Sequence, residues 1–276
     1  MITRKPSIAL AAGLLASMLL PGTAQAASPA AAPASASASP VRATALTRSP
    51  LYTSGRLPVT RCTEPSVTPG SVASARRYVV PLFNCLSRSW ATQLKKARIP
   101  FSKPSLQFIS KPQRVCGAKW PGHAQGLYCP NYRRIVVLLD KNITQQAEEL
   151  FLMDVIAHEY GHHVQNVSGI ERAFSRLPSR NKSEYNEQLR RLELQAECLS
   201  GAFIGSVWDS LDRPTDDWEF LLDATRESGD EHSKVRDHGK GRTIANWLRR
   251  GFQAAGPAGC NTWIGSSAMV ASTPAN

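Results

Sequence analysis

The stretch from Asp154 to Gln165 reads DVIAHEYGHHVQ. It contains the pattern HExxH, in which His158, Glu159 and His162 are the defining residues. Residues four apart lie one above the other on an α-helix, so both imidazoles leave one face and can bind one metal ion. Glu159 lies about 100° further round the helix, where its carboxylate can reach a water on that ion without being a ligand. The stretch therefore predicts a helical metal site with a separate base.

A second helix is predicted over 181–207, where the sequence opens with the Asn-x-x-Glu spacing of a capping box. Glu193 and Glu197 lie four residues apart on one face of this helix, where two like charges repel each other. Zinc on Glu193 and an imidazole donor on Glu197 would remove that repulsion. Salt bridges to Arg190, Arg191 or a remote lysine are the alternative.

The beginning of the chain has the order of a secretory signal peptide: basic residues, an apolar run and small residues up to Ala26. Residues 1–26 are therefore expected to be removed on export, and the mature protein to be secreted and extracellular. Residues 27–55 are rich in Ala, Ser and Pro, which predicts a disordered linker. The catalytic domain is expected over 56–264, followed by a flexible tail over 265–276. No later segment is apolar enough to predict a transmembrane helix.

Six cysteines, all in the exported part, favour up to three disulfides in an oxidising compartment. A cysteine zinc site is disfavoured because the chain has no CxxC pair. Two local loops are the simplest assignment, which leaves Cys198 for Cys260. A free Cys198, or its pairing with Cys116 or Cys129, is the alternative. The predicted bridges are Cys62–Cys85, Cys116–Cys129 and Cys198–Cys260.

The formal net charge is +12, and it becomes +10 once Arg4 and Lys5 are removed with the signal peptide. Such a balance favours anionic partners. The basic residues are scattered with no aromatic platform between them, so no nucleic-acid partner is expected. We interpret the charge as a solvated surface that can adhere to an anionic cell envelope.

Periodicity predicts further helices on both sides of the motif. Apolar residues between Ser71 and Ala97 predict a helix that begins close to Pro81. Asn142 or Thr144 is predicted to cap the helix that carries HExxH. Near the end of the chain, Thr215 is predicted to cap one helix, and a last helix is marked by Ile244, Trp247, Leu248 and Phe252.

These motifs resemble those of the putative neutral zinc metallopeptidases of bacteria. The resemblance covers roughly residues 115–260 and rests on GLYCP (126–130), HEYGHHVQ (158–165), ELQAECLSG (193–201) and His238-Gly239. It implies a zincin-like α+β fold, mainly helical, with a small β-sheet beside the HExxH helix. It also implies that Glu193 is the third ligand and that Glu197 supports a ligand histidine. Glu197 stands where the family pattern has Asp and is one methylene longer, so it stays open as an alternative ligand.

A strand is predicted over 134–139, where the run RIVVLL is strongly β-prone. In zinc peptidases with an HExxH helix, a strand beside the active site pairs its main chain with an extended substrate. Ile135 to Leu139 is the candidate for that role, and an ordinary core strand is the alternative.

Two imidazoles and one carboxylate leave a fourth zinc position open, as in catalytic sites. We expect one zinc ion per chain, Glu159 as the general base, and hydrolysis of peptide or protein substrates. The resemblance offers His238 as the donor to the transition state, and an ordinary surface histidine is the alternative. Tyr160, Tyr128 and His232 are the next candidates for this donor. The alternative is a non-catalytic secreted binding protein of the cell envelope with a structural metal site. An intact Glu159 argues against that alternative, because a structural site needs no base.

Overall fold

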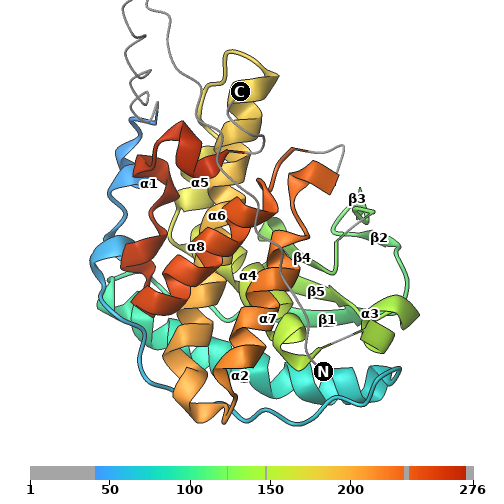
Figure 1. Cartoon of the computed structure of the whole chain (residues 1–276). Helices are drawn as coiled ribbons and strands as arrows, with labels where there is room; N and C mark the ends of the chain where they lie inside the picture. Colours follow the sequence, from blue (N-terminus) through green and yellow to red (C-terminus); the bar gives the residue numbers. More distant parts are fainter. Residues whose placement is uncertain (1–40, 123, 147, 233–235, 272–276) are drawn as a thin grey trace, which may run out of the picture. The chain divides into compact units, whose positions relative to one another are not determined.

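The computed structural model describes residues 41–122, 124–146, 148–232 and 236–271. Its fold is α+β and mainly helical, as predicted (Figure 1). The α-helices are α1 Thr44–Thr47, α2 Val72–Lys96, α3 Lys141–Gln146, α4 Glu149–Val167, α5 Ile170–Phe174, α6 Lys182–Val207, α7 Thr215–Arg226 and α8 Gly241–Ala254. The strands are β1 Ser105–Ile109, β2 Arg114–Val115, β3 Ala118–Lys119, β4 Gly126–Cys129 and β5 Arg134–Leu138. The 3-10 helices are η1 Pro50–Thr53, η2 Pro130–Tyr132, η3 Trp208–Ser210, η4 Asp230–His232, η5 Pro257–Cys260, η6 Thr262–Ile264 and η7 Ser267–Val270.

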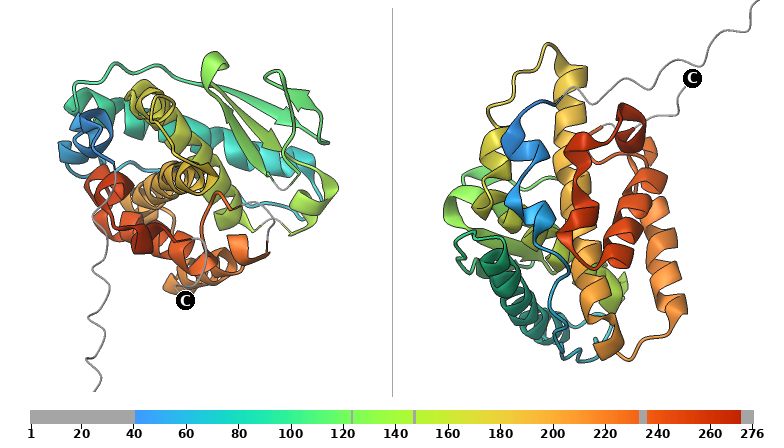
Figure 2. Two further views of the ribbon diagram at one scale, coloured as in Figure 1. Left: turned by 90° about the horizontal axis from the view of Figure 1, so that it is seen from above. Right: turned by 90° about the vertical axis from the view of Figure 1, so that its left-hand side faces the viewer.

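The main sheet has three strands in the order β1-β5-β4, with β5 parallel to β1 and antiparallel to β4. Successive side chains of a strand point to opposite faces. Ile135 and Val137 accordingly pack into the main core with α2 and α4, which lie along one side of the sheet (Figure 2). Val136 and Leu138 pack on the other side against Trp120, beside the small β2–β3 hairpin. The β-prone run thus forms the buried centre of the sheet.

Helix α2 begins at Val72, so the predicted start near Pro81 was wrong. The reason is a cap that the apolar pattern does not contain: the Ser71 hydroxyl accepts a hydrogen bond from the Ser74 N–H at 3.2 Å. Pro81 lies inside the helix, where the buried residues Tyr78 and Leu82 hold the turns on both sides of it. Burial therefore outweighs the local cost of the proline.

The segment before the HExxH motif forms two helices, not one. Asp140 caps α3, because its carboxylate accepts from the Ile143 N–H at 2.8 Å. The predicted cap at Asn142 or Thr144 was therefore wrong. A new helix, α4, then begins at Glu149 and carries the whole motif.

Helices α4 and α6 approach each other closely at Gly161. A Cβ on Gly161 would lie 2.8 Å from the backbone oxygen of Ala196, which is closer than packed atoms come. Glycine is a poor helix former, but at position 161 it is needed because a larger residue would not fit against α6. The predicted capping box on α6 is confirmed in its first half, since Asn181 Oδ1 accepts from the Glu184 N–H at 2.9 Å. The Glu184 carboxylate reaches back to the N–H of Arg180 and not to that of Asn181.

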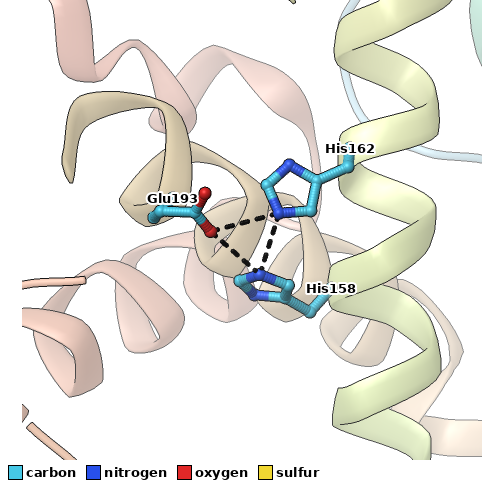
Figure 3. A group of neighbouring side chains, drawn as sticks. All are labelled: His158, His162 and Glu193. Carbon is cyan, nitrogen blue, oxygen red and sulfur yellow. Dashed lines mark hydrogen bonds and ion pairs between the residues drawn. The ribbon is translucent and has the colours of Figure 1, made fainter. Parts of the chain in front are cut away.

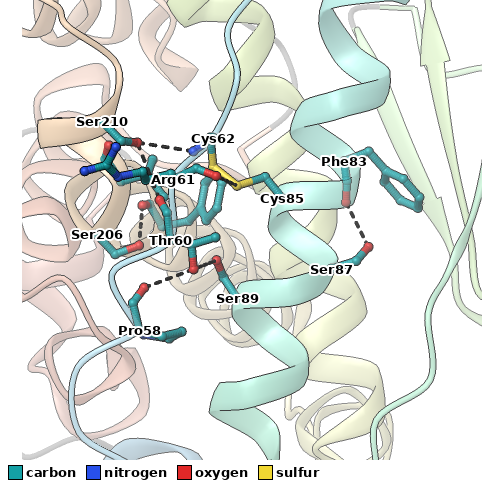
Figure 4. Close-up of a disulfide and its surroundings, with 12 residues drawn as sticks. Pro58, Thr60, Arg61, Cys62, Phe83, Cys85, Ser87, Ser89, Ser206 and Ser210 are labelled. Carbon is teal, nitrogen blue, oxygen red and sulfur yellow. Dashed lines mark hydrogen bonds between the residues drawn. A yellow bond between two sulfur atoms is a disulfide. The ribbon is translucent and has the colours of Figure 1, made fainter.

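The three predicted disulfides are all present: Cys62–Cys85, Cys116–Cys129 and Cys198–Cys260. Figure 4 shows the first, which joins the segment before α2 to that helix. The second joins the turn of the β2–β3 hairpin to the end of β4, and the third joins α6 to η5. The last helix, α8, also forms where predicted, whereas Thr215 is the first residue of α7 and not its cap.

The ends of the described chain are better packed than their composition suggested. Leu46, Leu51 and Tyr52 lie within the expected linker, yet they are buried in the main core. In the expected tail, Val270 is fully buried and the Trp247 indole N–H donates to the Met269 oxygen at 2.9 Å. The expected signal peptide, the linker up to residue 40 and the last five residues of the tail lie outside the described residues. Among the helices of the described ranges, none is both long and apolar enough to cross a bilayer.

Candidate metal centre

The structure brings His158 and His162 of α4 together with Glu193 of α6 (Figure 3). The two Nε2 atoms lie 3.2 Å apart. Glu193 Oε2 lies 3.1 Å from Nε2 of His162 and 3.5 Å from Nε2 of His158. Three donor atoms from two helices thus converge on one point, at the place where Gly161 lets the helices meet.

The opposite ring nitrogens of the two histidines have partners of their own. Nδ1 of His158 lies 2.8 Å from Glu197 Oε2, and Nδ1 of His162 lies 2.9 Å from Gln165 Oε1. The amide of Gln165 donates to the Leu192 carbonyl oxygen at 2.7 Å, so its oxygen must face His162. A neutral imidazole that donates from Nδ1 has its lone pair on Nε2. Both lone pairs therefore point at the place where the three donors meet.

These three donors fit a zinc ion. Zinc–nitrogen distances of about 2.0–2.1 Å in a tetrahedral site place neighbouring ligand atoms roughly 3.3 Å apart, close to the spacings found here. Burial alone would raise the pKa of the Glu193 carboxyl, but its contacts with His162 and His158 outweigh burial and hold that pKa well below the usual range. The carboxylate is therefore ionised, as a zinc ligand must be.

Glu159 lies beside this group and is 8% exposed. Burial raises the pKa of its carboxyl, while the two neighbouring histidines act in the opposite direction. Its side chain packs on strand β4, where a Cβ on Gly126 would lie 2.6 Å from Glu159 Cγ. Glycine at position 126 therefore makes room for this carboxylate, which explains the first residue of the GLYCP motif.

The strand next to the site is β4 and not β5. Both edges of β5 are hydrogen-bonded within the sheet, one to β1 and the other to β4. The main chain of Ile135 to Leu139 therefore has no free edge for a substrate. The interpretation of that run as a substrate-binding strand was wrong. One edge of β4 has no partner strand in the part of the chain that the structure describes. Because β4 also contacts Glu159 through Gly126, it is the strand that faces the candidate site.

His238 also lies at the site, as the sequence resemblance suggested. Its Nε2 lies 3.5 Å from Glu193 Oε2, and its Nδ1 lies 2.8 Å from Asp237 Oδ1. Asp230 fixes the turn, because its carboxylate accepts from the N–H groups of His238 and Gly239. Gly239 has φ +107°, a conformation that favours glycine.

The side chains of the two tyrosines considered as donors are packed around His163. The Tyr128 hydroxyl lies 3.0 Å from His163 Nδ1, and Tyr160 is fully buried against Phe83 and His163. His163 Nε2 donates to the Ser102 carbonyl oxygen at 2.6 Å, so its Nδ1 accepts from Tyr128. Burial lowers the pKa of His163 to about 4, which keeps it neutral at neutral pH. The side chain of His232 lies outside the described part of the structure.

Sequence reasoning missed the support behind His162. The buried Gln165 donates to Gln195 Oε1 at 3.1 Å, and Gln195 donates to the Tyr52 hydroxyl at 2.8 Å and to the Cys260 carbonyl oxygen at 3.0 Å. The usable signal was helical spacing, because Gln165 follows His162 by three residues and so lies next to it on α4. Tyr52 gave no such signal, since it is far away in the sequence.

Comparison with known proteins agrees with this geometry. The family described as "Putative neutral zinc metallopeptidase" matches residues 63–263. Two relatives named "Uncharacterized protein YpfJ", from Escherichia coli strain K12 and from Escherichia coli O6:H1 strain CFT073, are each 30% identical over 192 residues, which is 63% of this chain and 67% of each relative. No solved structure gives a significant match. The chain therefore belongs to the putative neutral zinc metallopeptidase family.

Proposed function

We propose that this chain is a secreted zinc-dependent peptidase that hydrolyses peptide bonds in peptides or proteins. The observation that carries the proposal is the convergence of His158, His162 and Glu193 beside the buried carboxylate of Glu159. A structural zinc site has no need of a carboxylate that is not a ligand. The three disulfides support the extracellular location, because such bonds persist in oxidising compartments.

His158, His162 and Glu193 would hold one zinc ion. Zinc bound there would act as a Lewis acid toward the scissile carbonyl and would lower the pKa of water. Glu197 and Gln165 hold the two imidazoles in the tautomer that presents Nε2 to the metal. The chain thus presents a prepared set of donors.

Glu159 would act as the general base. Its carboxylate would accept a proton from the attacking water and pass it to the leaving amine nitrogen. Gly126 and the backbone of Tyr128, which forms a hydrogen bond with Glu159, hold this side chain against β4. The free edge of β4 would pair with the main chain of an extended substrate next to the base.

Burial lowers the pKa of His238, but Asp237 and Glu193 outweigh burial and raise that pKa to about 9, so both ring nitrogens carry a proton at neutral pH. The Nε2–H of His238 would donate a hydrogen bond to the oxyanion that forms when water adds to the carbonyl. Its Nδ1 is held by Asp237, and its Nε2 points toward Glu193. A side chain fixed in this way does not need to reorganise during the reaction.

The test is the Glu159→Gln variant. Hydrolysis should fall to background while zinc content stays near one per chain, because the base is lost and the three ligands remain. Zinc is measured by elemental analysis and hydrolysis with a broad peptide library, with and without a chelator. The matched control is Glu219→Gln, an exposed residue on α7, which should leave both unchanged.

Loss of zinc from the Glu159→Gln variant would mean that Glu159 is a ligand. If the zinc-loaded natural protein cleaves no peptide of the library, the non-catalytic envelope-binding protein becomes the better account.

A further inference from the structure

Charge is divided unevenly along this chain. Between Pro65 and Leu139 there is no acidic residue. The same stretch has twelve basic residues: Arg76, Arg77, Arg88, Lys95, Lys96, Arg98, Lys103, Lys111, Arg114, Lys119, Arg133 and Arg134. Residues 140–276, by contrast, have twenty acidic and fifteen basic residues. The positive charge of the protein is therefore concentrated on α2 and the sheet.

These cations are exposed, and no carboxylate of the described residues forms an ion pair with them. Eleven of the twelve are exposed and Arg134 is half-buried. Within the described ranges, every ion pair of a lysine or arginine involves a residue beyond 139, such as Arg191 or Arg213, and none involves these twelve. A surface that is merely solvated usually mixes both signs of charge. The stretch 65–139 contributes only basic charges to the surface.

Four of the cations line one groove between the end of α2 and the loop that follows it. Two adjoining shallow hollows, which are wide open to solvent and have volumes of about 430 and 460 Å³, share Ala91 and Phe101. Arg88 and Lys103 line the first hollow, and Lys95 and Arg98 line the second. We name the set Arg88, Lys95, Arg98 and Lys103 the basic groove.

The loop that forms the basic groove is fixed in place. The Ser102 carbonyl oxygen accepts a hydrogen bond from Nε2 of His163 on α4 at 2.6 Å. Lys103 donates to Asn84 Oδ1 at 2.8 Å and lies 5.2 Å from the centre of the Phe83 ring. The groove therefore exists before any ligand arrives, which lowers the entropy cost of binding.

The end of α2 fixes the backbone position of Arg98. This residue follows the last turn of α2 with φ +57°, where the backbone N–H of Arg98 donates to the Lys95 carbonyl oxygen and that of Ile99 donates to the Leu94 carbonyl oxygen. This is the helix-ending motif in which glycine is usually found. Here the residue supplies a guanidinium to the groove.

We propose that the basic groove binds a flexible phosphate-bearing polymer at the cell surface. Arginine binds phosphate through paired N–H donors, and two arginines and two lysines along the groove can follow successive phosphates. Of the residues that line these hollows, Phe101 alone is aromatic, so stacking on successive bases is not provided. The lining residues also form no apolar helix face that could insert into a lipid layer.

The test measures binding of fluorescently labelled inorganic polyphosphate to the zinc-loaded mature protein by anisotropy. The variant combines Arg88→Ala, Lys95→Ala, Arg98→Gly and Lys103→Ala, in which glycine suits the backbone at position 98. The affinity of this variant for polyphosphate at low salt should fall by at least about tenfold. The slope of log binding constant against log salt concentration should become less steep by about 0.7 for each phosphate that the groove no longer neutralises. Zinc content should not change.

The control removes the same charge from outside the stretch 65–139, through Arg172→Ala, Arg176→Ala, Lys182→Ala and Arg242→Ala, all exposed. It should bind polyphosphate within about twofold of the natural protein, since these residues are outside the groove. Equal losses in both variants, or no loss in either, would overturn the proposal. Tighter groove-dependent binding of duplex DNA or anionic vesicles than of polyphosphate would overturn the choice of partner.

Discussion

The two histidines that face the candidate metal position are supported in different ways. His158 is supported by a carboxylate from α6, because Oε2 of Glu197 lies 2.8 Å from its Nδ1. Behind His162 stands a neutral amide, Gln165, from the same helix, and this amide depends on further buried partners. A carboxylate raises the basicity of a ligand histidine through its charge. An amide contributes mainly orientation, so its own position must be fixed by other groups.

The first test compares the loss of the proposed zinc ligand Glu193 with the loss of Glu197, which supports His158. Glu193→Ala should lower zinc affinity by more than the roughly 100-fold that the loss of an outer partner produces, because one of three donors disappears. Competition with a chromogenic chelator measures the affinity. If Glu197→Ala proves more damaging than Glu193→Ala, the ligand is Glu197 and the comparison of the two supports fails.

The next effect in size concerns Glu197. Glu197→Ala should lower zinc affinity by roughly 10- to 100-fold, since His158 loses both its orientation and its charged partner. Glu197→Gln keeps an oxygen that can accept from Nδ1, so its loss should be smaller. Equal losses in the two variants would show that the negative charge, and not the hydrogen bond, supports His158.

On the other side, Gln165→Leu should lower zinc affinity by roughly tenfold, because His162 loses the acceptor that fixes its Nδ1. Gln165→Glu should not restore it. A carboxylate offers an oxygen to His162 but has no N–H for the Leu192 carbonyl oxygen, which it would then repel. Recovery of affinity in Gln165→Glu would show that charge suffices on this side too, and that the neutral support has no special role.

How far the sequence predicts the site follows from how local each signal is. The two histidines and Glu159 lie within five residues on one helix, so spacing alone brings them together. Glu193 needed the close approach of α4 and α6, for which Gly161 was a usable sign. The role of β4 could not be predicted, because hydrophobicity favours β5 and a buried central strand is the more apolar one.

Residues near the ends of the domain are more closely packed than their composition indicates, for a related reason. Composition averaged over 27–55 is poor in large apolar residues, yet Leu46, Leu51 and Tyr52 belong to the main core. Their partners lie far away in sequence, so local composition contains no information about them. The disulfides were predictable because two of the three close short loops.

The smallest effect, and the most specific, should come from Tyr52. Its hydroxyl accepts from Gln195 at 2.8 Å and donates to the Leu46 carbonyl oxygen at 2.9 Å, at the far end of the series that supports His162. In Tyr52→Phe, Gln195 loses its hydrogen bond to the hydroxyl but still donates to the Cys260 carbonyl oxygen, so its side chain is held by fewer contacts. Loss of one hydrogen bond costs about 1 kcal/mol, and part of that cost should reach the metal as a two- to threefold weaker affinity, by the roughly tenfold per 1.4 kcal/mol relation.

If Tyr52 only stabilised the fold, its loss would affect zinc affinity no more than the loss of another buried tyrosine hydroxyl. Tyr78→Phe is the matched variant for this comparison. Tyr78→Phe also removes a buried hydroxyl, which donates to Glu64 and not to the glutamines behind His162, and should lower the unfolding temperature without changing zinc affinity. The two variants are therefore compared at one temperature at which both are folded. If both lower zinc affinity equally, the effect is loss of stability. If Tyr52→Phe leaves affinity unchanged, His162 is supported by Gln165 and Gln195 without the N-terminal segment.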